Sequence, residues 1–407
     1  MAIVEALKKF GTSLLGENYI PTEAKTDSQI AETIEGISKA IDDAGGIGGA
    51  ELWVPGTGNM SLKTIGATDS TNERSLAEGT RTTASGNSSH AEGGNTIASG
   101  YNSHAEGGGT TASGSDSHAE GSGTTASGVN SHAEGAGTTA SGGGSHAEGG
   151  GTQAIGGNSH AEGGGAQAIG PNSHAEGGGT KASAQCSHAE GVGTTASGDD
   201  SHAEGQNTTA SGTGSHAEGT GTEATGSGSH AEGSGTTASG NESHAEGMGS
   251  KATKARSHAE GSGTTASGQH SHVEGGGSTA SGDGSHAEGG GTTASGNNSH
   301  AEGGNTTASG VGSHAEGGGT IASGQYSHAE GSGTIASGQY SHAQGKFNIE
   351  DSNDTYAHIV GNGTNNNNRS NAHTLDWNGN AWFAGSLSLG NVTITSAQLQ
   401  SLLNLLN

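Results

Sequence analysis

The sequence predicts an all-β protein whose central part is a parallel β-solenoid, or β-roll, built from 14-residue coils. The unit SHAEGxGTTASGxx recurs twenty times over residues 75–345 without an insertion, and such a strict period is typical of stacked solenoid turns. Only 27% of the 407 residues are hydrophobic, and 83 are glycine, which is too few apolar side chains for a globular core of this length. Disorder is disfavoured as well, because a disordered low-complexity segment does not keep register.

Each repeat divides into two five-residue strands, SHAEG and TTASG, joined by short corners. Side chains alternate across a strand, so Ser, Ala and Gly of the first strand and the first Thr, Ala and Gly of the second are expected inside the coil. His and Glu then point outward on one side, and repeat positions 9 and 11 point outward on the other. Position 9 varies between copies, as a solvent-facing position does, with Ile97, Thr111, Gln153, Lys181 and Glu223 as examples.

The His and Glu of the repeat barely vary although both are predicted to point outward. Uniformity at outward positions indicates a covered face, and the expected cover is another copy of the chain. The small-residue interior buries too little apolar area to stabilise one coil alone, and three coils packed about an axis would solve both problems. We therefore expect a homotrimer with a His–Glu ladder at the interface, represented by His188, Glu190, His202, Glu204, His216 and Glu218.

The ladder is expected to be held by hydrogen bonds between each His and a Glu. If this pairing raises the folded pKa of the His, the trimer should resist heat better near pH 6 than near pH 8.5. An alternative is a metal ion on the three-fold axis, where the His of each layer, for example His90, His104 and His118, would meet. The first arrangement is the one we expect, with no metal and no cofactor.

The small-residue skeleton SxAxG, as in Ser103, Ala105 and Gly107, resembles the head repeats of trimeric autotransporter adhesins. Those repeats, of the form SVAIG-x-x-S-x-A-x-G, imply a left-handed parallel β-roll that trimerises. His and Glu stand here where that family usually has Val and Ile. The SHAEG version, followed by GKFNIEDSNDTYAHIVGNG and NAHTLDWNGNAWFAG, is similar to tail-fibre proteins of phages and prophages. That resemblance implies a virion protein that is assembled in the host cytoplasm.

The N-terminal segment, residues 1–50, is expected to trimerise and to attach the fibre to a component of the particle. Residues 27–43 (DSQIAETIEGISKAIDD) predict a helix because isoleucines recur at spacings of four, three and four. Isoleucine at both core positions of a coiled coil favours three or more strands; the isoleucines are Ile30, Ile34, Ile37 and Ile41. Residues 51–74 are expected to form an irregular β lead-in.

The C-terminal end differs sharply in composition from the repeats. Aromatic residues gather there, which predicts a small β-rich tip domain with a core of its own over residues 346–395. Residues 396–407 (SAQLQSLLNLLN) predict a short amphipathic helix capped by Ser396. Alternation along NAWFAG places Trp382 and Phe383 on opposite faces, so at least one should be exposed or lie at an interface between chains. The candidate receptor-binding residues are Trp377, Trp382, Phe383 and Tyr356.

Several classes of function are excluded or disfavoured. A net charge of −27 argues against binding to nucleic acid, and no run of eighteen apolar residues predicts a membrane span. The H-x-E motif occurs in zinc deaminases, but those enzymes also need a P-C-x-x-C motif, and Cys186 is the single cysteine. Paired carboxylates such as Asp199 and Asp200 are only a weak signal for glycan hydrolysis, so we expect no enzyme activity.

The function predicted from these observations is that of a trimeric fibre of a phage or phage-like particle. The repeats would form the shaft, and the tip would bind a glycan or protein of a bacterial surface, gaining avidity from three copies. One alternative is a purely structural head fibre or decoration protein that binds no receptor. The other is a fibre-borne enzyme that degrades surface polysaccharide.

Overall fold

The computed structural model describes residues 53–57, 62–64, 69–70, 72–390 and 392–406. The predicted N-terminal segment 1–50, with its helix at 27–43 and the isoleucines Ile30, Ile34, Ile37 and Ile41, lies outside the described residues. The chain divides into two compact units, Met1–Ser159 and His160–Asn407, and each is described by itself. No helix among the described residues is long and apolar enough to cross a membrane.

The first unit begins with a short lead-in and continues as regular coils. Strand β1 (Trp53–Pro55) pairs antiparallel with β2 (Leu62–Thr64), and β2 pairs in parallel with the first repeat strand. Strand β3 (Asp69–Ser70) begins the second face. The long strands of the coils are β4 (Leu76–Thr80), β6 (His90–Gly94), β8 (His104–Gly108), β10 (His118–Ser122), β12 (His132–Ala136) and β14 (His146–Gly150). The short strands are β5 (Thr83–Ala84), β7 (Ile97–Ala98), β9 (Thr111–Ala112), β11 (Thr125–Ala126), β13 (Thr139–Ala140) and β15 (Gln153–Ala154).

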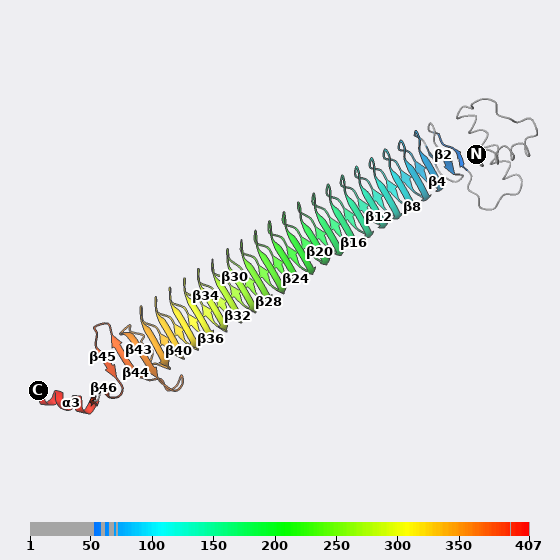
Figure 1. Ribbon diagram of the computed structural model, residues 1–407. Helices are drawn as coiled ribbons and strands as arrows, with labels where there is room; N and C mark the ends of the chain where they lie inside the picture. The colour runs from blue at the N-terminus through cyan, green and yellow to red at the C-terminus, as the bar shows by residue number, and fades with distance from the viewer. Residues whose placement is uncertain (1–52, 58–61, 65–68, 71, 391, 407) are drawn as a thin grey trace, which may run out of the picture. The chain divides into compact units, whose positions relative to one another are not determined.

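The second unit repeats the same coil and then changes at its C-terminal end (Figure 1). Its long strands are β16 (His160–Gly164), β18 (His174–Gly178), β20 (His188–Val192), β22 (His202–Gln206), β24 (His216–Thr220), β26 (His230–Ser234), β28 (His244–Met248), β30 (His258–Ser262), β32 (His272–Gly276), β34 (His286–Gly290), β36 (His300–Gly304), β38 (His314–Gly318), β40 (His328–Ser332) and β42 (His342–Lys346). Its short strands are β17 (Gln167–Ala168), β19 (Lys181–Ala182), β21 (Thr195–Ala196), β23 (Thr209–Ala210), β25 (Glu223–Ala224), β27 (Thr237–Ala238), β29 (Lys251–Ala252), β31 (Thr265–Ala266), β33 (Thr279–Ala280), β35 (Thr293–Ala294), β37 (Thr307–Ala308), β39 (Ile321–Ala322) and β41 (Ile335–Ala336).

The predicted β-solenoid with 14-residue coils is confirmed. Within each unit, every long strand pairs in parallel with the long strand of the next coil, exactly one repeat away, so that His188 lies beside His202 and Glu190 beside Glu204. The short strands pair in the same way on the other face of the coil, as Thr195 does with Thr209. Identical residues therefore stack in columns along each unit.

The inward and outward faces are those that alternation predicts, except that the Gly of SHAEG, expected inside, is exposed at Gly205. Repeat positions 1, 3, 8 and 10 are buried, as Ser201, Ala203, Thr208 and Ala210 show in one coil. The interior is thus made of small side chains, and Val273 is the largest residue at position 3. His and Glu of the long strand remain half-exposed on the outside.

The strands differ in length from the predicted pair of five-residue strands. The first strand starts at the His and includes the residue after SHAEG, while the second is only two residues long. Ser at position 1 belongs to the corner instead: the Ser201 hydroxyl donates a hydrogen bond of 2.6 Å to the carbonyl oxygen of Gly198, three residues earlier. This bond ties the corner together and fixes where the next strand begins.

One glycine column is required by the close approach of consecutive coils. Gly107 has a φ of +110°, and a Cβ added there would overlap the carbonyl oxygen of Gly121 in the next coil. Every copy of the repeat keeps glycine at this position. The glycine later in the repeat is less strictly kept, because Ala184 and Lys254 take the position of Gly114 in two coils.

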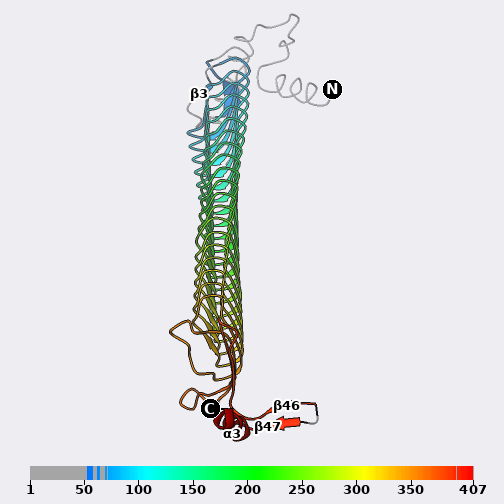
Figure 2. The same ribbon diagram turned by 90° about the vertical axis from the view of Figure 1, so that its left-hand side faces the viewer.

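The C-terminal part of the second unit continues the sheet of long strands. Strand β43 (Tyr356–Asn362) pairs in parallel with β42, and β44 (Asn371–Asp376) and β45 (Ala381–Phe383) follow in antiparallel order. A hairpin of β46 (Leu387–Leu389) and β47 (Val392–Ile394) leads to helix α3 (Ser396–Leu406). Figure 2 shows this hairpin and α3 beyond the last coil.

The expected aromatic core of the tip does not form within one chain. Ile359 is the buried large hydrophobic residue of β43, whereas Trp377, Trp382 and Phe383 are all exposed. The reason is that β43–β45 extend a single sheet whose opposite faces carry Trp382 and Phe383, and among the described residues no second layer buries either ring.

The cap of the C-terminal helix is Thr395 and not Ser396. The Thr395 hydroxyl accepts a hydrogen bond of 3.2 Å from the backbone N–H of Gln398, and the Gln398 side-chain oxygen accepts one of 2.9 Å from the N–H of Thr395. This reciprocal pair is a capping box. A threonine followed three residues later by a glutamine was the sequence signal for it.

Candidate functional site

The long strands carry a continuous column of stacked histidines within each unit. In the first unit the rings of His90 and His104 lie with centroids 4.8 Å apart and planes 7° from parallel. In the second unit the rings of His188 and His202 are 4.7 Å apart and 14° from parallel. The parallel register of the strands sets this spacing, which is the separation of neighbouring strands in a sheet.

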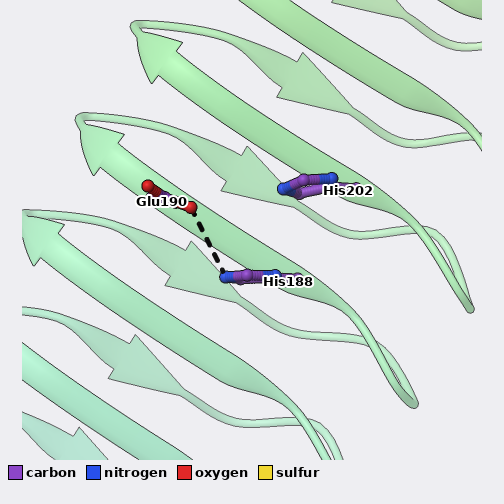
Figure 3. A group of neighbouring side chains, drawn as sticks. All are labelled: His188, Glu190 and His202. Carbon is purple, nitrogen blue, oxygen red and sulfur yellow. Dashed lines mark ion pairs between the residues drawn. The ribbon is translucent and has the colours of Figure 1, made fainter.

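A column of glutamates runs beside the histidines, two residues further along each strand. Figure 3 shows one of them, Glu190, beside His188 and His202. His188 and Glu190 of one coil have their Nε2 and Oε2 atoms 4.0 Å apart. The same distance is 3.4 Å for His202 and Glu204 and 3.7 Å for His216 and Glu218. The structure thus brings together all six residues that the sequence predicted for the His–Glu ladder, here within one chain.

The expected hydrogen bond between each His and a Glu is mostly absent in the single chain. The Nε2 atoms of His188, His202 and His216 are buried and lack a hydrogen-bond partner. A direct pair does form at the start of the ladder, where His90 Nε2 lies 2.9 Å from the Glu78 carboxylate of the preceding coil. Glu78 belongs to the first coil, which carries Leu76 in place of the repeat histidine, so Glu78 has no histidine of its own coil beside it.

The environment lowers the pKa of His188 and His202, contrary to the expectation that pairing would raise it. For His188 and His202, partial burial is the largest cause of the lowered pKa, and repulsion from the next histidine adds to it. The neighbouring glutamates act in the opposite direction but do not outweigh these two causes. A stacked column favours the neutral imidazole, because two protonated rings would stand only 4.7–4.8 Å apart and repel each other.

The column of rings continues past the last repeat, which the repeat pattern did not reveal. The centroid of His358 lies 5.2 Å from that of His342, His373 follows at 5.7 Å, and Phe383 ends the series at 4.7 Å. The signal was available in the sequence as YAHIVGN, in which His358 takes the register of the repeat histidine.

Three of the four candidate receptor-binding residues are exposed, with Trp377 in the turn after β44 and Trp382 and Phe383 in β45, whereas Tyr356 lies in β43. Trp382 is 53% exposed and Phe383 41% exposed, and the Trp377 indole N–H donates a hydrogen bond of 3.1 Å to the Asp354 carbonyl oxygen. Tyr356 is half-buried.

A second aromatic pair lies at the corners of the last coils. The rings of Tyr326 and Tyr340 stack with centroids 5.3 Å apart. Both residues adopt left-handed φ values, 55° and 57°, at a corner where other coils carry Gly, Asn or Asp and, in the same conformation, Glu242, Arg256 and His270.

The other candidate residues have structural surroundings. The Asp199 carboxylate accepts a hydrogen bond of 3.2 Å from the Gln185 backbone N–H of the preceding coil, and Asp200 occupies a left-handed corner position. Cys186 lies at an exposed corner. His90, His104 and His118 lie in consecutive coils of one column.

The family model that describes the YadA head domain repeat matches parts of the solenoid. The matched residues are 77–103, 119–145, 189–215, 203–229, 301–327 and 315–341. These segments lie in both compact units and share the coil described above. No curated protein sequence matches the chain.

Proposed function

We propose that the chain is an adhesin-like subunit of a homotrimeric fibre on a phage or phage-like particle, with a C-terminal region that binds a bacterial surface. The similarity of its coils to YadA head repeats supports the fibre. The observation that carries the proposal is the large amount of apolar surface that the C-terminal part leaves open in one chain.

The exposed apolar residues of this part come from two elements. Trp382 and Phe383 lie on β45, and α3 exposes Leu399, Leu402 and Leu405, the last at 82%. Contiguous exposed apolar residues mark interaction sites, and an 11-residue helix is too short to be stable without packing. We assign the α3 leucines to contacts between three copies and the β45 aromatics to the receptor.

The receptor class that fits these aromatics is a cell-surface glycan or an exposed protein. Aromatic rings bury a large area and can use a polar edge for hydrogen bonding, and the stacked Tyr326 and Tyr340 add a second exposed platform in the same unit. Three copies would multiply weak contacts into avidity. The N-terminal residues 1–50 would attach the fibre to the particle.

Two measurements test the proposal. Light scattering of the full chain should give three times the mass of the 39.1 kDa chain. Fluorescently labelled protein should bind bacteria of a susceptible host, and Trp382→Ala should reduce this binding without changing the mass. A monomer would overturn the fibre assignment, and unchanged cell binding by W382A together with a W377A/F383A variant would overturn the receptor assignment.

A further inference from the structure

We infer that the His–Glu ladder binds divalent transition-metal ions such as Zn²⁺, each held by two histidines of consecutive coils and one glutamate of the same chain. The described residues contain groups of this kind whose potential ligand atoms all lie within 4.8 Å of one another, among them His202–Glu204–His216 and His244–Glu246–His258. Imidazole nitrogen and carboxylate oxygen are suitable ligands for zinc. All ligands come from one chain, so the inference does not depend on the proposed trimer.

The separation of His and Glu fits a shared cation better than a direct hydrogen bond. The Nε2–Oε2 distance is 3.4 Å for His202–Glu204 and for His244–Glu246. A hydrogen bond would bring the atoms to about 2.7–3.2 Å. Two ligands that are each about 2.0–2.1 Å from a tetrahedral zinc ion lie roughly 3.4 Å apart. The two atoms therefore stand where a cation between them would place them.

The histidine nitrogens are also otherwise unused. Nε2 of His202, His216 and His244 is buried from solvent and makes no hydrogen bond. A buried polar atom without a partner calls for an explanation such as an ion. The same condition holds at most ladder histidines, including His104, His118, His132, His174, His188, His230, His258, His272, His286, His300, His314 and His328.

The ring spacing limits how many ions the ladder can hold. Adjacent rings are 4.8 Å apart, so two of them must lean toward each other by about 20° in total to reach one tetrahedral ion. A ring that leans toward one neighbour leans away from the other, and His202 belongs to two overlapping groups. Ions should therefore lie between at most every second pair of neighbouring histidines, and we call the space between two neighbouring histidines a gap.

Charge favours this occupancy. The glutamates of successive coils stand side by side in the parallel register, and like charges at this distance repel by about 1 kcal/mol even in water. One divalent ion in every second gap would neutralise the two carboxylates of its two coils. Neighbouring ions would then be separated by two coil spacings.

The test uses the full chain after dialysis against a chelator and then into metal-free buffer. Equilibrium dialysis with ZnCl₂ should show saturable binding of several ions per chain, and CoCl₂ should give the intense visible absorption of tetrahedral Co²⁺. The ladder variant is E204Q/E218Q/E246Q. The chain itself carries Gln344 at this repeat position, so the substitution suits the fold, and circular dichroism checks this.

The matched control is D199N/E223Q/D283N, which removes the same three charges from outside the ladder. Because Glu204 and Glu218 belong to overlapping groups that share His216, the ladder variant should lose about one or two ions per chain and the corresponding share of Co²⁺ absorption, while the control keeps the wild-type values. Replacing His202 and His216 with leucine, the residue that Leu76 supplies in the first coil, should cause a similar loss. Absence of saturable binding, or equal losses in the ladder variant and the control, would overturn the inference.

Discussion

The imidazole rings of His202 and His216 lie 4.8 Å apart and within 2° of parallel, although fourteen residues separate them in the chain. Each ring covers the face of the next, so the column shields itself from water on two sides. The ring edges remain open, and the His202 side chain is 35% exposed. This partial burial is the leading cause of the lowered His202 pKa.

Stability should decrease as the solution becomes acidic. The folded pKa of His188, His202 and His230 lies below the ordinary histidine value of 6.5, so these residues bind protons in the unfolded chain first as the pH falls. The contribution is therefore fully present above pH 6.5 and is lost as the pH falls through the folded pKa. Thermal melts with a chelator present should give a lower melting temperature at pH 5 than at pH 7.5. A higher melting temperature at pH 5 would show that attraction to the glutamates outweighs burial and raises the histidine pKa.

Removing stacked rings should destabilise the solenoid more than changing the opposite side of the same coils. The triple variant H188A/H202A/H216A loses ring contacts worth roughly 0.5–1.5 kcal/mol per pair. The matched control is T195A/T209A/E223A, which alters position 9 in the same three coils. The melting temperature of the histidine variant should be clearly lower than that of the control, and equal values would mean that the ladder is merely solvated.

Two adjacent glycines should respond very differently to alanine. Gly107→Ala places a methyl group on the carbonyl oxygen of Gly121, whereas Gly108→Ala meets no atom within 4 Å. Overpacking of this kind costs about 1–3 kcal/mol or more, so chemical denaturation should show a large loss of stability for G107A. The G108A variant should stay near the wild type. Similar stabilities would indicate that consecutive coils can move apart.

The α3 leucines should control assembly. Leu402→Ser and Leu405→Ser remove apolar side chains that one chain leaves exposed, so a monomer would gain solubility and lose nothing. In a trimer the same changes remove buried contacts worth up to about 2 kcal/mol each in each chain. Sedimentation of the double variant at low concentration should therefore show dissociation, while Gln400→Ser on the same helix should not. A wild-type sedimentation profile for the double variant would place the trimer contacts elsewhere.

Much of the coil could be read from the repeat because each residue type has one place where it fits. Ala203 and Thr208 are buried and Glu204 is not, as strand alternation requires. The length of the second strand could not be read, because it depends on the geometry of the corner, where the Ser201 hydroxyl bonds to the Gly198 carbonyl oxygen. The aromatic tip core was predicted wrongly for one chain, since composition does not say whether a second layer covers Trp382.

The sequence by itself determined the period, the parallel architecture and the inward and outward faces of this protein, because a fixed 14-residue repeat forces identical residues into columns. Only the tertiary structure decided what those columns do. It placed the His202 and Glu204 atoms 3.4 Å apart without a hydrogen bond, and it set the histidine pKa below its ordinary value. Both outcomes depend on the stacking distance between coils and on the burial that stacking creates, and neither quantity can be derived from the repeat pattern alone.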